Sequence, residues 1–187
     1  MDVSDTLAAE LRARFEALEP DLRFRDEAQA MHACELALHS LLAGTYGVGA
    51  LLMDDRHRVW AESGNEVLSG RFDSAAHAEM RAFDQLEARE NTPPSQTLSL
   101  LVTLEPCPMC LSRALYAGVG EIVYLVEDGE GGMAHLRDHL PPALKELAQL
   151  CHFRRADVSD PLRDLAESLS RAGLQAHREE LMHKRAS

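Results

Sequence analysis

The stretch TLSLLVTLEPCPMC, residues 97–110, decides the fold of this chain. Its first half is a short apolar run, which is typical of a strand covered on both faces. Pro106 ends that strand, because proline has no N–H to give to a sheet. Cys107 and Cys110 follow, and their spacing of three places both side chains on one face of a helix. The dipole at the start of a helix stabilises thiolates, so this pair is suited to binding zinc.

A third metal ligand and an acid lie upstream, in the segment AAHAEM, residues 75–80. His77 precedes Cys107 by 30 residues, and Glu79 follows His77 by two. Three protein ligands leave one position of a tetrahedral zinc for water, which is the arrangement of a catalytic site. His-x-Glu followed by Pro-Cys-x-x-Cys is the pattern of zinc-dependent cytosine and adenine deaminases.

These two clusters resemble the cytidine deaminase-like superfamily, and most of all its nucleobase branch of guanine deaminases, cytosine deaminases and bacterial tRNA adenosine deaminases. The resemblance covers roughly residues 44–126. It implies that His77, Cys107 and Cys110 hold one Zn²⁺ per chain and that Glu79 is the catalytic proton shuttle. Water is then the co-substrate, and it replaces the amine on a ring carbon with release of ammonia.

The resemblance also implies three contacts to the substrate. Asn65 lies where related deaminases place an asparagine that hydrogen-bonds the base, and the main-chain N–H of Ala78 is expected to bind the substrate carbonyl. In the family, the segment after the fourth strand often supplies a recognition acid, for which Asp128 is the first choice. Glu127 and Glu130 remain alternatives, because all three lie in an acidic, glycine-rich stretch that also suits an ordinary turn.

The charge and composition of the chain exclude some partners. Its 187 residues carry 19 Lys and Arg against 31 Asp and Glu, a formal net charge of −12. Such a surface repels phosphate backbones, so no nucleic-acid partner is expected. No apolar run approaches the ~20 residues of a membrane span, and the N-terminal segment lacks a signal-peptide core. We expect a cytoplasmic protein without a membrane partner, in which Cys34 and Cys151 are free, buried thiols.

The order of the expected elements predicts an α/β fold. Two strand–helix–strand crossovers flank the zinc motif, which indicates a three-layer α/β/α sandwich with a mixed five-stranded sheet, cytidine deaminase-like, with added N- and C-terminal helices. The helix carrying His77 is expected at 76–89, and Gly49 in the first strand is expected to let the pocket floor approach a flat ligand. The predicted division is an N-terminal helical extension (1–25), a zinc-dependent deaminase domain (26–158) and a C-terminal helix (159–187).

The sequence therefore predicts a hydrolase that acts on the C–N bond of a cyclic amidine, a deaminase of a free nucleobase or a related heterocycle. Guanine, and with it purine metabolism, is the first choice, because SAAHAE at 74–79 looks most like that branch. A tRNA-specific adenosine deaminase and a cytosine or nucleoside deaminase remain alternatives. A different class, a catalytically inactive zinc-binding regulatory protein on the same fold, is disfavoured by Glu79, which a purely structural site does not need. The resemblance and the chain length also indicate a homodimer.

Overall fold

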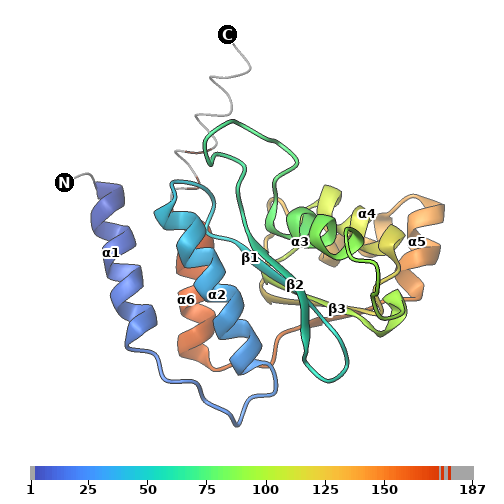
Figure 1. Ribbon diagram of the computed structural model, residues 1–187, viewed down its shortest axis with the longest axis horizontal. Helices are drawn as coiled ribbons and strands as arrows, with labels where there is room; N and C mark the ends of the chain where they lie inside the picture. The colour runs from blue at the N-terminus through green and yellow to red at the C-terminus, as the bar shows by residue number, and fades with distance from the viewer. Residues whose placement is uncertain (1–2, 173, 175–176, 178–187) are drawn as a thin grey trace.

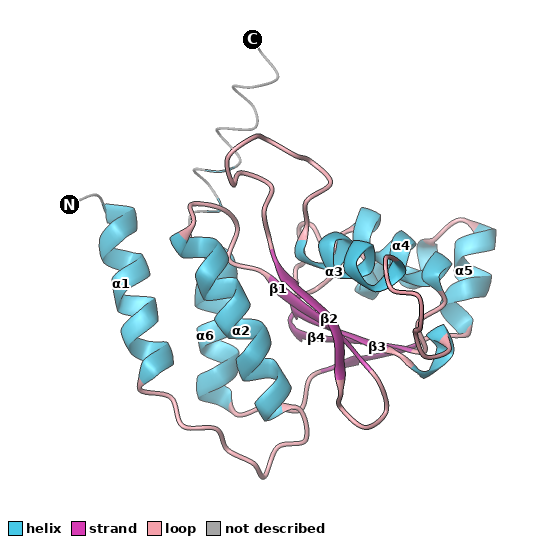
Figure 2. Cartoon of the chain, in the orientation of Figure 1, coloured by secondary structure: helices cyan, strands magenta, loops and turns pink. Residues whose placement is uncertain are grey.

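The computed structural model describes residues 3–172, 174 and 177, and in it a five-stranded sheet lies between two layers of helices (Figures 1 and 2). One layer contains α1 (Val3–Glu16), α2 (Glu27–Leu42) and α6 (Asp160–Arg171). The other contains α3 (Ala78–Glu87), α4 (Pro108–Ala117) and α5 (Pro142–Gln149), with short 3₁₀ turns at Ser95–Thr97 and Ala134–His139. The predicted α/β/α sandwich is confirmed.

The sheet is mixed, as predicted. Its strands are β1 (Gly49–Met53), β2 (Val59–Gly64), β3 (Ser99–Leu104), β4 (Glu121–Val126) and β5 (His152–Arg155), in the spatial order β2-β1-β3-β4-β5. β1 runs antiparallel to β2 and β3, whereas β3, β4 and β5 are parallel. Leu100 of β3 pairs with Leu52 on one side and with Ile122 on the other. The chain leaves the carboxyl end of β3 directly into the cysteine motif.

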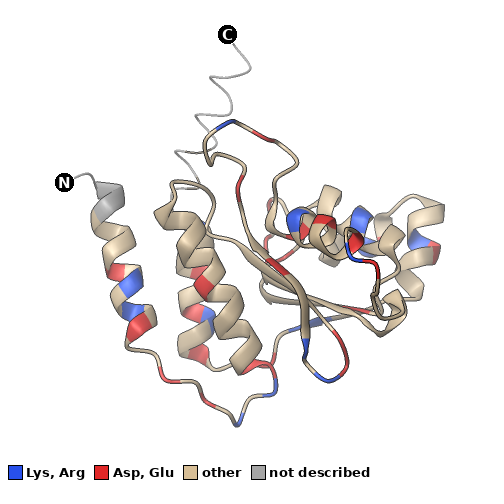
Figure 3. Cartoon of the chain, in the orientation of Figure 1, with Lys and Arg blue, Asp and Glu red and all other residues tan. Residues whose placement is uncertain are grey.

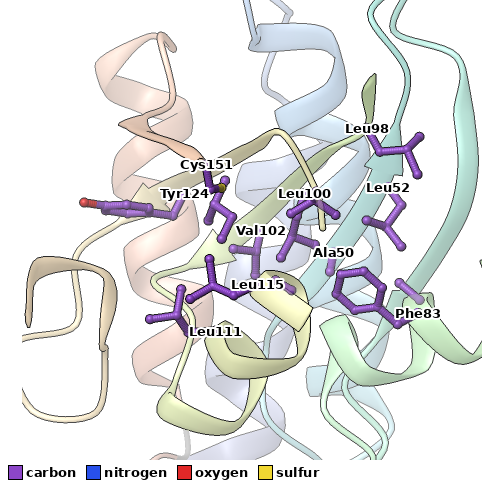
Figure 4. Close-up of a cluster of buried hydrophobic side chains, with 14 of the residues drawn as sticks. Ala50, Leu52, Phe83, Leu98, Leu100, Val102, Leu111, Leu115, Tyr124 and Cys151 are labelled. Atoms are coloured by element: carbon purple, nitrogen blue, oxygen red, sulfur yellow. The ribbon is translucent and has the colours of Figure 1, made fainter. Parts of the chain in front are cut away.

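Successive residues of β3 face opposite sides of the sheet, and each side has its own apolar cluster. On the side of α3, α4 and α5, Leu100 packs in a cluster with Phe83 and Leu111 (Figure 4). On the other side, Leu101 packs in a cluster that includes Leu11 of α1 and Leu162 of α6. All six side chains are at most 1% exposed. The two layers of apolar packing fix α3 and α4 against the sheet, and these are the helices that carry the motif.

The terminal helices share one apolar cluster with α2. Leu11 belongs to α1, and Leu162, Leu165 and Leu169 belong to α6. The division of the chain at residues 25/26 and 158/159 stays a prediction. The predicted C-terminal helix is described as α6 up to Arg171, and residues 173, 175–176 and 178–187 lie outside the described part of the chain.

Gly49 has a packing role that differs from the expected one. A Cβ atom on Gly49 would lie 2.1 Å from the carbonyl oxygen of Ala33 and 2.9 Å from the backbone nitrogen of Ala37. Both atoms belong to α2, so glycine at this position allows the helix to approach the first strand closely. The expected reason for this glycine was a ligand on the pocket floor, and the backbone of α2 is the neighbour that the structure shows.

Candidate active site

The three expected metal ligands meet at the beginnings of two helices. His77 is the N-cap residue of α3 and Cys107 that of α4, and both have extended backbone (ψ 152° and 169°). Cys110 lies in the first turn of α4 and is fully buried. The Nδ1 atom of His77 lies 3.7 Å from Sγ of Cys107 and 3.6 Å from Sγ of Cys110. The helix of the motif therefore begins at Ala78, two residues later than expected, because His77 caps it.

The geometry of this cluster fits a tetrahedral zinc ion. With Zn–S near 2.3 Å and Zn–N near 2.0–2.1 Å, tetrahedral N and S ligands lie about 3.6 Å apart. The two measured N–S distances, 3.6 and 3.7 Å, match that value. One ligand atom from each of the three residues lies within 4.8 Å of the others, and in the described part of the chain no other group of this kind occurs. Two sulfurs and one imidazole are also the donor types that zinc prefers.

The electrostatics of the cluster favour a cation. A hydrogen bond from Cys110 lowers the pKa of Cys107 to about 4, helped by His77 and opposed by burial. Burial lowers the pKa of His77, but the hydrogen bond and the charge of Cys107 outweigh it, so the pKa lies above the ordinary value. The hydrogen bond with Cys107 and burial raise the pKa of Cys110, so the pair favours one thiolate, on Cys107, at the positive end of a helix dipole.

Glu79 lies in the first turn of α3 and is 4% exposed. Burial raises the pKa of its carboxyl, and the negative charge of Cys107 raises it further. A carboxyl whose pKa is raised toward neutrality exchanges protons with water and substrate more readily than an ordinary glutamate. This environment is the one that a proton shuttle needs.

Asn65 follows the last residue of β2 and is 4% exposed. Its Oδ1 atom accepts hydrogen bonds from the hydroxyl of Thr45 (2.8 Å) and from the backbone N–H of Val67 (3.0 Å). The next residue, Glu66, donates its backbone N–H to the carbonyl of Ala76, immediately before His77. The structure therefore brings Asn65 alongside the segment that carries the histidine.

Ala78 is the first residue of α3 and is fully buried. The first N–H groups of a helix have no partner within the helix, so they are available to a ligand. A carbonyl oxygen of a bound molecule is a suitable acceptor at this position, where the helix dipole favours negative partial charge.

The three acidic candidates after β4 have different surroundings. The Oδ1 atom of Asp128 accepts the backbone N–H groups of Glu130 and Gly131, both at 3.1 Å, so this carboxylate organises its own turn. Glu127 forms a 3.7 Å ion pair with Arg155. Which of the acids contacts a substrate stays a prediction.

Glu105 is a buried acid that the sequence reasoning missed. Its side chain is fully buried, and its carboxylate accepts the backbone N–H groups of Asp128 (2.9 Å) and His135 (2.8 Å) and faces Nδ1 of His135 at 2.8 Å. A Cβ atom on Gly132 would lie 2.5 Å from its Cδ atom. Glu105 therefore ties the segment after β4 to the turn before Cys107. The feature of the sequence that could have identified Glu105 is its position directly before the Pro-Cys pair of the motif.

A polar cavity of about 430 Å³ lies along the connection between β2 and α3. Arg81 is one of the lining residues and forms ion pairs with two others. Its Nε atom lies 3.2 Å from a carboxylate oxygen of Glu66, and a terminal nitrogen lies 2.8 Å from one of Asp73. The residues that line it are Glu66, Ser69, Arg71, Phe72, Asp73 and Arg81.

The remaining two cysteines agree with expectation. Cys34 and Cys151 are free and buried, and burial raises the pKa of both thiols, that of Cys151 to about 12. Neither belongs to the metal-binding cluster.

The fold and the cluster together are typical of zinc-binding deaminases. The model of the cytidine and deoxycytidylate deaminase zinc-binding region matches residues 24–126, more than half of the chain. The chain belongs to this deaminase family. Among the described residues, no helix has the length and apolar character that crossing a membrane requires.

Sequence relatives include proteins that act on tRNA. The chain is 32% identical over 114 residues to the tRNA-specific adenosine deaminase of Haemophilus influenzae, covering 61% of this chain and 65% of that protein. It is 45% identical over 60 residues to the tRNA(Ile)-lysidine synthase of Deinococcus radiodurans, covering 32% of this chain and 10% of the synthase. The chain thus spans less than two thirds of the length of both relatives.

Solved structures confirm the fold. A structure from a study of A-to-I editing by tRNA:A34 deaminases has a TM-score of 0.58 at 26% identity, covering 71% of this chain and 100% of that chain. The guanine deaminase from Nitrosomonas europaea has a TM-score of 0.59 at 21% identity, covering 81% of this chain and 88% of that chain.

Proposed function

We propose that this protein hydrolytically deaminates a free nucleobase or a similar small heterocycle, with guanine as the first candidate. The observation that carries the proposal is the position of Glu79. It is a buried carboxyl in the first turn of α3, two residues beyond a metal ligand, with its pKa raised by burial. A site that served only to hold a metal would gain nothing from burying an acid there.

His77, Cys107 and Cys110 are proposed to hold one zinc ion. When bound, zinc supplies Lewis acidity, which lowers the pKa of water from 15.7 toward ~7. Glu79 accepts a proton from the attacking water and delivers it to a ring nitrogen of the substrate. After the C–O bond has formed, Glu79 takes the remaining proton of the added hydroxyl and passes it to the amine. The C–N bond then breaks, ammonia leaves, and the oxygen becomes the ring carbonyl. The products are the carbonyl form of the ring and one ammonia molecule per water consumed.

Asn65 and Ala78 are proposed to orient the ring. The carboxamide nitrogen of Asn65 donates to an acceptor on the base, and the N–H of Ala78 donates to the substrate carbonyl at the start of α3. Asp128 is the proposed recognition acid, with Glu127 and Glu130 as alternatives. Guanine offers both a carbonyl and a donor edge, so it can satisfy these three groups together.

The distribution of charge supports a small substrate rather than RNA. Basic side chains are interspersed with acidic ones in the structure instead of gathering on one face (Figure 3). Arg81, Arg113 and Arg154 all form ion pairs with acids, and the segment after β4 adds further negative charge. With a net charge of −12, binding to a phosphate backbone gains little from counterion release.

A second candidate is deamination of an adenosine in tRNA. The specific observation in its favour is the 32% identity over 114 residues to a tRNA-specific adenosine deaminase. The proposed chemistry of Glu79 and the zinc ligands is the same for both candidates, so the substrate must be decided by measurement.

We expect ammonia release from a free base, with guanine the fastest of a panel of guanine, cytosine, adenine, cytidine and adenosine. A tRNA with adenosine at the wobble position is assayed in parallel for inosine, and by gel shift at physiological salt. The electrostatic argument predicts neither inosine nor a salt-sensitive shift. Inosine in the tRNA without ammonia from any base would establish the second candidate instead. A zinc-loaded protein that is inactive on every substrate would favour the regulatory class.

We also infer a homodimer. α4, which begins at the metal site, exposes 71% of Tyr116 and 36% of Met109, and Leu150 after α5 is 81% exposed. Apolar side chains on neighbouring helices are what a symmetric interface buries. Light scattering is expected to give twice the chain mass of 20.7 kDa. A mass of one chain at every concentration tested would contradict this.

A further inference from the structure

We propose that Thr45 is a positioning residue for substrate recognition, which fixes the carboxamide of Asn65 so that its nitrogen faces the ligand. The inference rests on the proposed function, because it assumes that Asn65 binds the base. The observation that supports the inference is a hydrogen bond between two polar side chains that are both almost fully buried. Thr45 is 0% exposed and Asn65 is 4% exposed, and they are hydrogen-bonded across 20 residues of sequence.

The surrounding donors determine which way the carboxamide points. The backbone nitrogen of Val67 lies 3.0 Å from Oδ1 of Asn65, and of the two polar atoms of a carboxamide only the oxygen can accept an N–H. The backbone N–H of Leu68 donates to the hydroxyl oxygen of Thr45 at 3.3 Å. A hydroxyl that accepts there still has its own proton, which Thr45 donates to Oδ1 of Asn65 at 2.8 Å. Two donors thus hold the oxygen, and the nitrogen must point away from both.

The nitrogen of the carboxamide remains available. Among the described residues, no partner is found for Nδ2 of Asn65, whereas Oδ1 has two. Within that same part of the chain, Arg81 Nε is the one fully buried side-chain nitrogen or oxygen without a hydrogen bond. Nδ2 therefore still reaches open space, and its two N–H groups can donate to a bound base.

Thr45 is itself held firmly. Its backbone N–H donates to the carbonyl of Ser40 in α2 at 3.1 Å, and Gly44 before it has a positive φ of 80°, which ends the helix in a tight turn. The hydroxyl then reaches Asn65 and Leu68, at two points of the connection that leads to His77. Thr45 therefore links the end of α2 to Asn65, the proposed substrate-binding residue.

Removing the hydroxyl should weaken recognition and leave the chemistry intact. Thr45→Val keeps the shape of the side chain but frees one lone pair of Asn65 and allows the carboxamide to turn. We expect KM, and the dissociation constant of a non-reacting base analogue, to rise about two- to tenfold. We expect kcat to change less than twofold, since Glu79 and the zinc ligands are untouched. Thr45→Ser retains the hydroxyl and should restore values close to those of the unaltered protein.

A double-mutant cycle with Asn65→Ala separates positioning from general loosening. If Thr45 acts through Asn65, Thr45→Val should have no further effect on KM once Asn65 is alanine. An equal effect in both backgrounds, or no effect in either, would overturn the inference. Thermal unfolding is measured for each variant, and Thr45→Ala is a second variant if the valine protein does not fold.

A readout without turnover keeps this inference separate from the proposed function. In ¹⁵N NMR of the side-chain amides, Asn65 should give one sharp NH₂ pair in the unaltered protein and in Thr45→Ser. The pair should broaden or shift in Thr45→Val. If no base is deaminated but this difference is seen, the proposed function fails and the positioning by Thr45 stands. Identical spectra in all three proteins would refute the positioning whatever the substrate.

Discussion

Replacing Glu79 with glutamine is expected to abolish turnover while leaving the fold, the zinc and base binding in place. Glutamine has nearly the same shape, and Glu79 is not one of the proposed ligands, so the change removes only the capacity to take and give protons. General acid–base catalysis contributes typically 10²–10⁴-fold. Because Glu79 is proposed to act on the water, on the ring nitrogen and on the leaving amine, the loss of kcat should lie at or beyond that range.

The measurement compares kcat, zinc content and the affinity for a base analogue in Glu79→Gln and in a matched control. Glu87→Gln makes the same chemical change at the other end of α3, where the side chain is 58% exposed and pairs with Arg113. The control should retain nearly full activity, since an exposed ion pair contributes little. If Glu79→Gln keeps more than about a tenth of normal turnover, the loss is smaller than a proton shuttle contributes, and the proposed mechanism is wrong.

Replacing Cys107 with alanine is expected to remove zinc and activity together. The change deletes the thiolate with the lowered pKa and leaves two ligands. Loss of a residue that only supports a metal ligand typically costs 10–100-fold in metal affinity, so loss of a direct ligand should cost at least about as much. Purified protein should contain near one equivalent of zinc, and the variant far less, with turnover falling in step.

Cys151→Ala is the matched control, because Cys151 is another free cysteine but lies outside the metal-binding cluster. It should keep its zinc and its turnover per folded molecule. Treating the unaltered protein with a chelator should reproduce the effect of Cys107→Ala, and adding zinc should reverse the chelation but not the mutation. A Cys107→Ala protein with a full equivalent of zinc would refute this ligand set.

The sequence was sufficient for the fold, because its elements follow local patterns, and for the meeting of His77, Cys107 and Cys110, because the two motifs match a known family. The apolar run before Pro106 and the turn after it place the cysteines at a helix start, and the structure places them there. The shift in the start of α3 from 76 to Ala78 has a local cause as well. His77 is the N-cap residue, and histidine is not among the residue types preferred there, so the sequence does not predict this cap.

The parts that were missed depend on contacts between distant segments. Thr45 reaches Asn65 across 20 residues, and Glu105 reaches His135 across 30. No single stretch of sequence encodes either hydrogen bond. The identity of the recognition acid after β4 could not be predicted for a related reason. An aspartate at a glycine-rich turn can bind a ligand or its own backbone, and Asp128 binds its own backbone.

The proposed ligands come from two different helices, and this makes the stability of the protein a function of zinc activity. His77 caps α3, Cys107 caps α4 and Cys110 lies in the first turn of α4, so an ion bound to all three cross-links segments 30 residues apart. An unfolded chain does not hold these atoms together. By mass action, free zinc at 100 times the dissociation constant then adds about 2.7 kcal/mol to the free energy of unfolding. A cell that limits zinc would therefore lose this protein by unfolding and proteolysis as well as by loss of the proposed activity.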